Sequence, residues 1–150
     1  QHYQFNQWEA SDKVQRTDFN ADNAKIDAAI RGVAQRAEEI AAAIPKVALG
    51  TYTGNGAETR LIPLPFPPKA VMVVSQEGRM RYNFSSSSYY TYGGLALAGS
   101  PAMDSTGKAA VAIQPDGFQV AYRNYEDSAH VHHYTFTNKR SKGYHYIALG

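Results

Sequence analysis

The sequence predicts a mainly β protein with an N-terminal helix, in which a parallel coiled-coil stalk precedes an antiparallel β-sandwich head. Two observations predict this fold class. Apolar residues repeat with a heptad period up to Pro45, and the chain after Pro45 consists of short β-type runs separated by Gly, Asn, Asp and Pro. The 150 residues therefore divide into an N-terminal segment (1–16), a coiled-coil helix (17–45) and a head (46–150).

The coiled-coil helix is predicted from apolar residues at alternating steps of three and four. Its a positions are Asn23, Ile30, Ala37 and Ile44, and its d positions are Phe19, Ile26, Val33 and Ile40. Because β-branched residues dominate both positions, the pattern favours three or four strands over two. We expect Thr17 to cap the first turn, Asp18 to interact with the positive end of the helix dipole, and Pro45 to end the helix.

Asn23 allows two interpretations. As an a-position residue inside the coiled coil, it would form a polar layer that fixes register and oligomeric state at a cost in stability. Alternatively, it lies in a frayed first turn of the helix. We favour the first interpretation.

The N-terminal segment carries Tyr3, Phe5 and Trp8 in a polar setting without a sustained period. Such a segment has no core of its own, so its aromatic side chains are expected to pack against something else. One interpretation is a collar that folds back on the helices of the oligomer. The other is a docking element for a larger particle.

Seven strands are predicted in the head. They are residues 46–53, 58–64, 69–76, 95–98, 109–114, 118–122 and 144–149. The first two flank Gly54-Asn55-Gly56, which predicts a hairpin because Gly and Asn accept the positive φ of such turns. Regularly spaced strands with little helix between them favour an antiparallel sandwich.

Two segments, 79–94 and 123–143, are rich in Tyr, Ser, Asn, Thr and His and poor in aliphatic residues. This composition is typical of recognition surfaces, so we predict two ligand-binding loops. The candidate ligand-binding residues are Arg81, Tyr82, Asn83, Tyr89, Tyr90, Tyr92, Tyr125, His133 and Tyr134. The alternative is that the aromatic residues alternate along further strands, which we favour for residues 134–137.

Catalysis and metal binding have little support in the sequence. The carboxylates show no catalytic spacing and no Gly-rich phosphate loop follows a strand, so we predict no enzyme activity and no cofactor. If residues 130–133 form a strand, His130 and His132 share a face and could meet a metal on an oligomer axis, but exposed histidines are the preferred interpretation, and no metal is predicted.

Charge and hydropathy exclude two further partners. The net charge is +2 and the basic residues are scattered, which argues against nucleic acid. No run of eighteen apolar residues occurs, so no membrane insertion is expected. Cysteine is absent, which excludes a disulfide framework.

The segment from Phe5 to Ile30, FNQWEASDKVQRTDFNADNAKIDAAI, resembles the N-terminal region of tail-fibre and receptor-binding proteins of bacteriophages and phage-tail-like particles. A looser resemblance covers ALGTYTGNG at 48–56, PKAV at 68–71 and YHYIALG at 144–150. These head motifs consist of turn and core residues, so the resemblance describes architecture better than it describes a ligand.

The resemblance implies a homotrimer located in the virion and assembled in the bacterial cytoplasm. Its N-terminus would dock on a baseplate or tail protein, and its receptor-binding head would contact a bacterial surface polysaccharide or protein. Attachment would be non-covalent, and a glycan is the expected ligand. The rival hypothesis is a purely structural baseplate or tail-tip component whose aromatic segments bind another virion protein.

Overall fold

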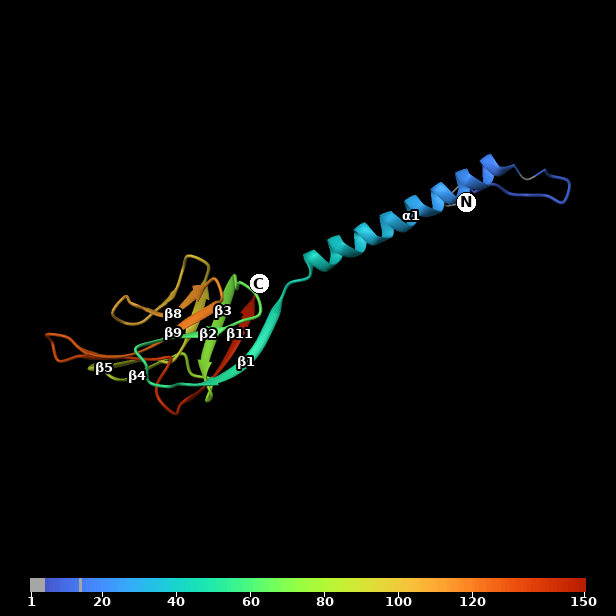
Figure 1. Cartoon of the computed structure of the whole chain (residues 1–150). Helices are drawn as coiled ribbons and strands as arrows, with labels where there is room; N and C mark the ends of the chain where they lie inside the picture. The colour runs from blue at the N-terminus through green and yellow to red at the C-terminus, as the bar shows by residue number, and fades with distance from the viewer. Residues whose placement is uncertain (1–4, 14) are drawn as a thin grey trace. The chain divides into compact units, whose positions relative to one another are not determined.

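A computed structural model describes residues 5–13 and 15–150. This part of the chain folds into one helix and eleven strands (Figure 1). It divides into two compact units that meet in sequence between Ile44 and Pro45, and each unit is described by itself. The predicted class, a mainly β protein with an N-terminal helix, is confirmed.

The helix α1 (Arg16–Ala43) has 28 residues, which gives a length of about 42 Å. Its N-cap is Gln15, which makes no side-chain capping hydrogen bond, so the prediction that Thr17 caps the helix was wrong. The helix ends at Ala43, and the C-cap residue Ile44 has an extended backbone, because a residue before proline is disfavoured in the helical conformation. Asn23 lies two turns inside α1 rather than at a frayed end.

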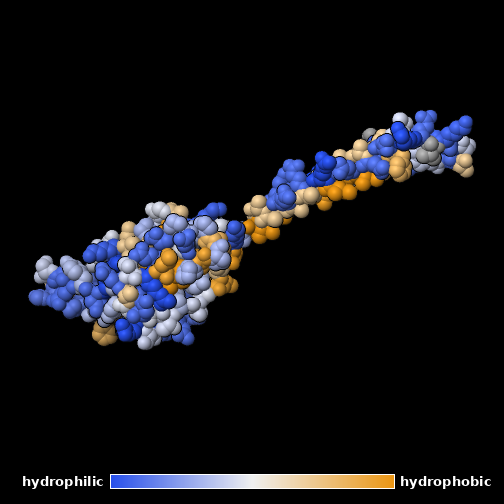
Figure 2. Space-filling view, viewed as in Figure 1, coloured by the Kyte–Doolittle hydropathy of each residue, from blue (hydrophilic) through white to orange (hydrophobic). Residues whose placement is uncertain are grey.

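The apolar residues of α1 form a stripe along one side of the helix, seen in orange in Figure 2. None of the helix residues that the structure describes is buried. The stripe residues are Phe19, Ile26, Ile30, Val33, Ile40 and Ile44, with exposed fractions of 59, 43, 62, 65, 64 and 62%. A helix with such a stripe is normally stabilised when the stripe packs against another apolar surface. The single chain provides no such surface for the stripe residues that the structure describes.

The N-terminal segment turns back along the first turns of α1. The backbone N–H of Asn6 donates to the Asp22 carboxylate at 3.0 Å, and the Asn6 side chain donates to the Asp18 carbonyl at 3.3 Å. Trp8 remains 41% exposed, and Tyr3 lies outside the described residues. These hydrogen bonds involve Asn6 and not the aromatic residues, so the collar and the docking interpretations both stay predictions.

A four-stranded antiparallel sheet begins directly after the helix. Its order is β1 (Val47–Thr53), β11 (Gly143–Leu149), β3 (Ala70–Ser75) and β6 (Gly94–Leu97). Gly50 on β1 faces Tyr146 on β11, and a Cβ at Gly50 would collide with the Tyr146 ring. A glycine is therefore needed where this tyrosine crosses the neighbouring strand.

A seven-stranded sheet curls into half a barrel. Its order is β4 (Arg81–Ser85), β5 (Ser88–Thr91), β10 (His132–Phe136), β9 (Gly117–Glu126), β8 (Ala109–Gln114) and β7 (Ala102–Met103), and β2 (Thr59–Pro63) pairs with β9. The pair β5 and β10 is parallel. The prediction of a wholly antiparallel sandwich was therefore wrong for this pair.

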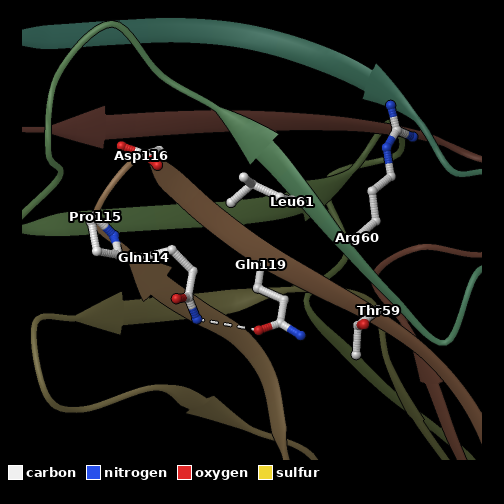
Figure 3. A pocket seen from close by; sticks show the side chains of 7 residues that line it. All are labelled: Thr59, Arg60, Leu61, Gln114, Pro115, Asp116 and Gln119. Atoms are coloured by element: carbon white, nitrogen blue, oxygen red, sulfur yellow. Dashed lines mark hydrogen bonds between the residues drawn. The ribbon is translucent and has the colours of Figure 1, made fainter.

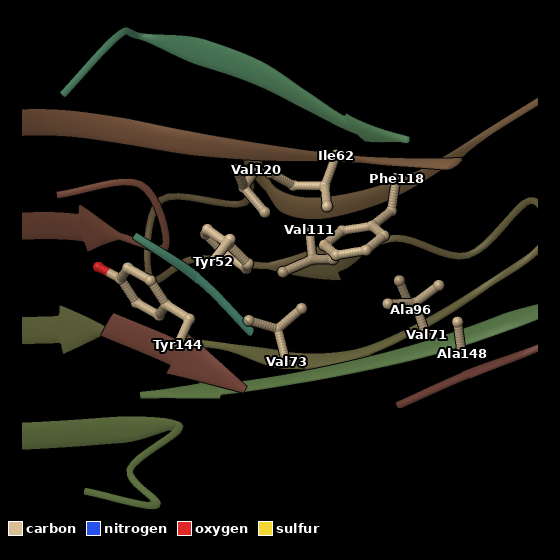
Figure 4. Close-up of a cluster of buried hydrophobic side chains, with 10 residues drawn as sticks. All are labelled: Tyr52, Ile62, Val71, Val73, Ala96, Val111, Phe118, Val120, Tyr144 and Ala148. Atoms are coloured by element: carbon tan, nitrogen blue, oxygen red, sulfur yellow. The ribbon is translucent and has the colours of Figure 1, made fainter. Parts of the chain in front are cut away.

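The hydrophobic core lies between the two sheets (Figure 4). The four-stranded sheet contributes Tyr52, Val71, Val73, Ala96, Tyr144 and Ala148, and the strands β2, β8 and β9 contribute Ile62, Val111, Phe118 and Val120. Tyr52 and Tyr144 stack at 4.9 Å, and burial raises the pKa of Tyr144 to about 12. The Tyr144 hydroxyl donates to the Phe136 carbonyl, which ties the core to β10.

The segment around Gly54-Asn55-Gly56 is a crossover, not the predicted hairpin. Strand β1 pairs with β11 and β2 pairs with β9, so the two strands belong to different sheets. The buried side chain of Asn138 holds the crossover. It donates to Asn55 Oδ1 at 2.7 Å and to the Ala57 carbonyl at 2.9 Å, and it accepts from the Asn55 N–H at 3.2 Å.

Replacing Asn138 by Ala should lower the free energy of unfolding of the head by about 2–3 kcal/mol, because several crossover polar groups lose their buried partner. Urea denaturation of the full chain, followed by tyrosine fluorescence, measures this loss. The exposed Asn124 provides the matched control: Asn124→Ala should change the free energy by less than about 0.5 kcal/mol. Equal losses in the two variants would contradict the role of Asn138.

Candidate functional site

The predicted ligand-binding segments 79–94 and 123–143 are largely strands rather than loops. They form β4, β5 and β10, the end of β9 and the first residue of β6 and of β11. The strand predicted for residues 134–137 is present up to Phe136, where β10 ends, but burial does not alternate along it, because Thr135 and Phe136 are both buried. Because side chains alternate across a sheet, the candidate residues fall on two opposite faces.

We call the first of these the tyrosine face. Its predicted members are Tyr82, Tyr90, Tyr92 and Tyr134, and the structure adds Tyr122. The opposite face carries Arg81, Asn83, Tyr89, Tyr125 and His133. The sequence predicted these residues as ligand contacts on two loops, and a single ligand cannot contact both sides of the sheet.

Three tyrosines form a row across three strands of the tyrosine face. Tyr82 on β4 is opposite Tyr90 on β5, and Tyr90 is opposite Tyr134 on β10. Their ring centroids are 6.3 Å apart for the first pair and 4.7 Å for the second, which is stacked. The row continues to Asn124 on β9, so it ends in an amide that can donate and accept hydrogen bonds.

Phe136 packs against the tyrosine rings on the same side of the sheet. It is 6% exposed and lies 5.2 to 6.0 Å from the rings of Tyr90, Tyr92, Tyr122 and Tyr134. The tyrosines themselves are partly exposed, and Tyr82 is 41% exposed. The face therefore presents fixed rings to solvent at a low entropic cost for any ligand that stacks on them.

Polar and cationic groups surround the rings. His132 stacks on Tyr134 at 5.9 Å and is opposite Ser88 and Glu126 on the neighbouring strands. Arg79 and Lys142 lie 5.2 and 5.3 Å from the rings of Tyr82 and Tyr92. An apolar floor with hydrogen-bonding groups at its edge is the arrangement that binds sugars and other amphipathic ligands.

Glu77 holds Lys142 at this edge. The Lys142 ammonium donates to both carboxylate oxygens of Glu77, at 2.9 and 3.0 Å, and these hydrogen bonds lower the pKa of Glu77 to about 2. Glu77 is therefore ionised at neutral pH. The pair fixes a cation beside Tyr92.

The opposite face has its own row. His133 stacks on Tyr89 at 5.6 Å and lies 5.9 Å from Tyr125. Its Nε2 is 3.2 Å from Asp127 Oδ2 and its Nδ1 is 2.8 Å from Ser105 Oγ. Both ring nitrogens are thus engaged within the chain, and Tyr125, which is 51% exposed, is the accessible ring of this row.

Asp104 binds β9 and β10 on the face that carries His133. Its carboxylate is 7% exposed and accepts from Thr135 Oγ1 at 2.6 Å, Thr106 Oγ1 at 2.7 Å and Arg123 Nη2 at 3.2 Å. Burial alone would raise the pKa of Asp104, but the hydrogen bonds from Thr135 and Thr106 hold it well below its ordinary value. Asp104 is therefore a structural anion that links β10 and β9 to the turn before β8.

The hollows of the head are shallow. Figure 3 shows one of about 340 Å³ on the strands β2, β8 and β9, where Gln114 donates to Gln119 at 3.2 Å. None of its lining residues was predicted as a ligand contact. Another hollow, of about 440 Å³, is bordered by Tyr122, Asn124 and Tyr125 at the edge of the tyrosine face.

The hypothesis that His130 and His132 hold a metal required residues 130–133 to form a strand, and they do not. His130 has a φ of 58° and precedes β10, which begins at His132. Its Nδ1 lies 2.7 Å from Glu126 Oε1. Within residues 5–13 and 15–150, no three His, Asp or Glu side chains are grouped to hold a metal ion.

Tyr122 and Asn124 are the tyrosine-face residues that sequence analysis missed. The signal was the two-residue period of Tyr122, Asn124 and Glu126, which continues the strand predicted for 118–122. Within the part of the chain that the structure describes, no helix has the length and apolar character needed to cross a membrane.

Comparisons with models of protein families, with curated proteins and with solved structures gave no match to this chain. A functional proposal therefore depends on the residues and geometry of the chain and on the resemblance of residues 5–30 described above.

Replacing Asp104 by Asn should lower the free energy of unfolding by about 2–3 kcal/mol at pH 7, because a buried charged acceptor is lost. The pKa of Asp104 is lower in the folded than in the unfolded state, so its contribution is complete above pH 3.8 and is lost as the pH falls towards the folded value. The difference between the variant and the parent should shrink below pH 4. Urea denaturation at a series of pH values measures it.

The exposed Asp116 provides the control. Asp116→Asn should change the free energy of unfolding by less than about 0.5 kcal/mol at pH 7. A gap between Asp104→Asn and the parent that stays constant down to pH 2 would contradict the assignment of Asp104 as a structural anion.

Proposed function

We propose that this chain is a homotrimeric tail-fibre or receptor-binding protein of a bacteriophage or phage-tail-like particle. Its helices form a parallel coiled-coil stalk, its N-terminal segment docks on the tail, and its head attaches the particle to a bacterial surface glycan without covalent chemistry. The observation that carries this proposal is the exposed apolar stripe of α1, which leads within three residues into a β head.

The stripe supports the oligomer. Its isoleucine and valine side chains are 43 to 65% exposed in the single chain, and they occupy a and d positions of a heptad. β-branched residues at both positions favour trimers and tetramers, and the phage-like segment that includes the start of α1 favours the trimer. Asn23, two turns inside the helix, then sets the register of the three helices.

The tyrosine face supports glycan binding. Sugars present CH groups that pack on aromatic rings and hydroxyls that bond to amide, hydroxyl and charged groups. The row of Tyr82, Tyr90 and Tyr134 offers the rings, and Asn124 offers the amide. Three heads on one stalk repeat this surface, so a weak site gains avidity without new contacts.

A structural role remains the rival proposal, since protein interfaces also favour tyrosine. In that case the tyrosine face would bind a neighbouring virion protein. Under the attachment proposal bacterial cells should retain the purified protein, whereas under the structural proposal tail particles should retain it.

The oligomer is tested by the mass of the full chain in solution. Light scattering should report three times the chain mass of 16.5 kDa at micromolar concentration. Ile30→Asp, which places three charges in the stripe, should reduce the mass to that of one chain. Ala28→Asp, at an exposed f position, should leave the trimer intact. A single-chain mass for the parent would overturn the proposal.

Glycan binding is tested with a matched pair of exposed tyrosines. Tyr82, 41% exposed, belongs to the tyrosine face, and Tyr125, 51% exposed, belongs to the opposite face. On an array of purified bacterial polysaccharides, Tyr82→Ala should weaken binding by up to about tenfold per site, because one lost stacking contact costs up to about 1.5 kcal/mol. Tyr125→Ala should bind within twofold of the parent.

The same protein preparations distinguish the structural role from attachment to bacteria. If no polysaccharide and no bacterial strain retains the parent trimer, while purified tail particles retain it and Tyr82→Ala abolishes that retention, the structural proposal replaces attachment. Equal losses in the two tyrosine variants would contradict the tyrosine face as the binding surface.

A further inference from the structure

The outward side of the four-stranded sheet carries a continuous apolar surface, which we call the apolar sheet face. Strand pairing places its residues in two rows across β1, β11, β3 and β6. The first row is Val47, Leu149, Ala70 and Leu97, and the second is Leu49, Ile147, Met72 and Leu95. The core residues of these strands point the other way, so these side chains are not part of the core.

Six of these aliphatic side chains are strongly exposed. Val47, Leu49, Leu95, Leu97, Ile147 and Leu149 have exposed fractions of 56, 72, 56, 46, 40 and 44%. Figure 2 shows orange, hydrophobic residues on the surface of the head as well as along α1. Two rows across four strands span roughly 14 by 20 Å, or about 280 Å², which is close to the size of the largest apolar patch that a typical monomer exposes, and such patches are often functional.

We propose that the apolar sheet face packs against the same face of two further copies of this chain around the axis of the stalk. This inference depends on the trimer of the proposed function and extends it from the helix to the head. Three features of the sequence and structure support a second copy as the occupant.

The first feature is continuity. Only Pro45 and Lys46 separate Ile44, the last residue of the helix stripe, from Val47, the first residue of the sheet face. Three residues span at most about 11 Å. If the three Ile44 side chains meet on the axis, each copy therefore starts its sheet face beside that axis.

The second feature is the absence of charge. Both rows are aliphatic throughout, and the next row, Thr51, His145 and Val74, carries the one titratable side chain of the three rows. A threefold axis brings identical side chains together, so a charge in the face would meet its own copies and repel them. An uncharged face therefore suits packing of identical copies close to such an axis.

The third feature is area. Three patches of this size bury roughly 900 Å² together, which is below the 1,000 Å² or more of a stable interface. The face is thus too small to assemble heads by itself. It suits chains that α1 already holds together, because the stalk makes the contact intramolecular and raises the effective concentration to the millimolar range.

The test uses the absence of cysteine from the chain. Ile147→Cys places a thiol in the middle of the apolar sheet face, and Leu61→Cys places one at the exposed Leu61 of β2, in the other sheet. Their parent side chains are 40 and 46% exposed, so the two variants are matched. The full-length variants are treated with a short bismaleimide and, separately, with a maleimide dye, and their mass is measured by light scattering.

The expected result is a trimer for both variants, with covalent dimers only for Ile147→Cys and at least tenfold slower dye labelling of Ile147→Cys than of Leu61→Cys. A trimer in which Ile147→Cys labels as fast as Leu61→Cys and gives no covalent dimer overturns the sheet-face contact and leaves the stalk trimer standing. The face would then be free for another protein. A single-chain mass overturns the proposed trimer itself.

Discussion

The apolar stripe of α1 is the constraint on which the rest of the molecule depends. A helix of 28 residues with its isoleucines and valines in water gains little from packing, and most helical stability in proteins comes from packing such a face. The stripe is as regular as a heptad allows, so the missing partner surface must have the same period. A copy of the same helix would supply that period, which is why we propose that several chains complete the stalk together.

The two-residue period of β-strands is the second constraint, and it decides which aromatic residues can act together. Tyr89 and Tyr90 are neighbours in sequence, yet Tyr90 stacks with Tyr134 on one side of the sheet and Tyr89 stacks with His133 on the other. The parallel pairing of β5 with β10 sets both contacts, because it aligns residues far apart in the sequence. Composition alone cannot distinguish the two faces.

Local patterns predicted much of the fold. The heptad located α1 to within a few residues, and each of the seven predicted strands is present. The failed predictions share a cause, because contacts with residues far away in the sequence determine the local structure at these positions. Gly54-Asn55-Gly56 has the sequence of a hairpin turn, but the buried Asn138 binds it as a crossover between sheets. Residues 81–85 and 88–91 have few aliphatic side chains, but their tyrosines pack on Phe136 and on each other.

The surfaces that we propose for assembly and for recognition belong to different sheets of the head. Along β9 the core residues Phe118 and Val120 are followed on the same side by Tyr122 and Asn124, so the tyrosine face extends the inner side of the curled sheet. The apolar sheet face lies on the outward side of the other sheet. The two surfaces therefore consist of different side chains on different sheets, with aliphatic residues on one and aromatic residues on the other.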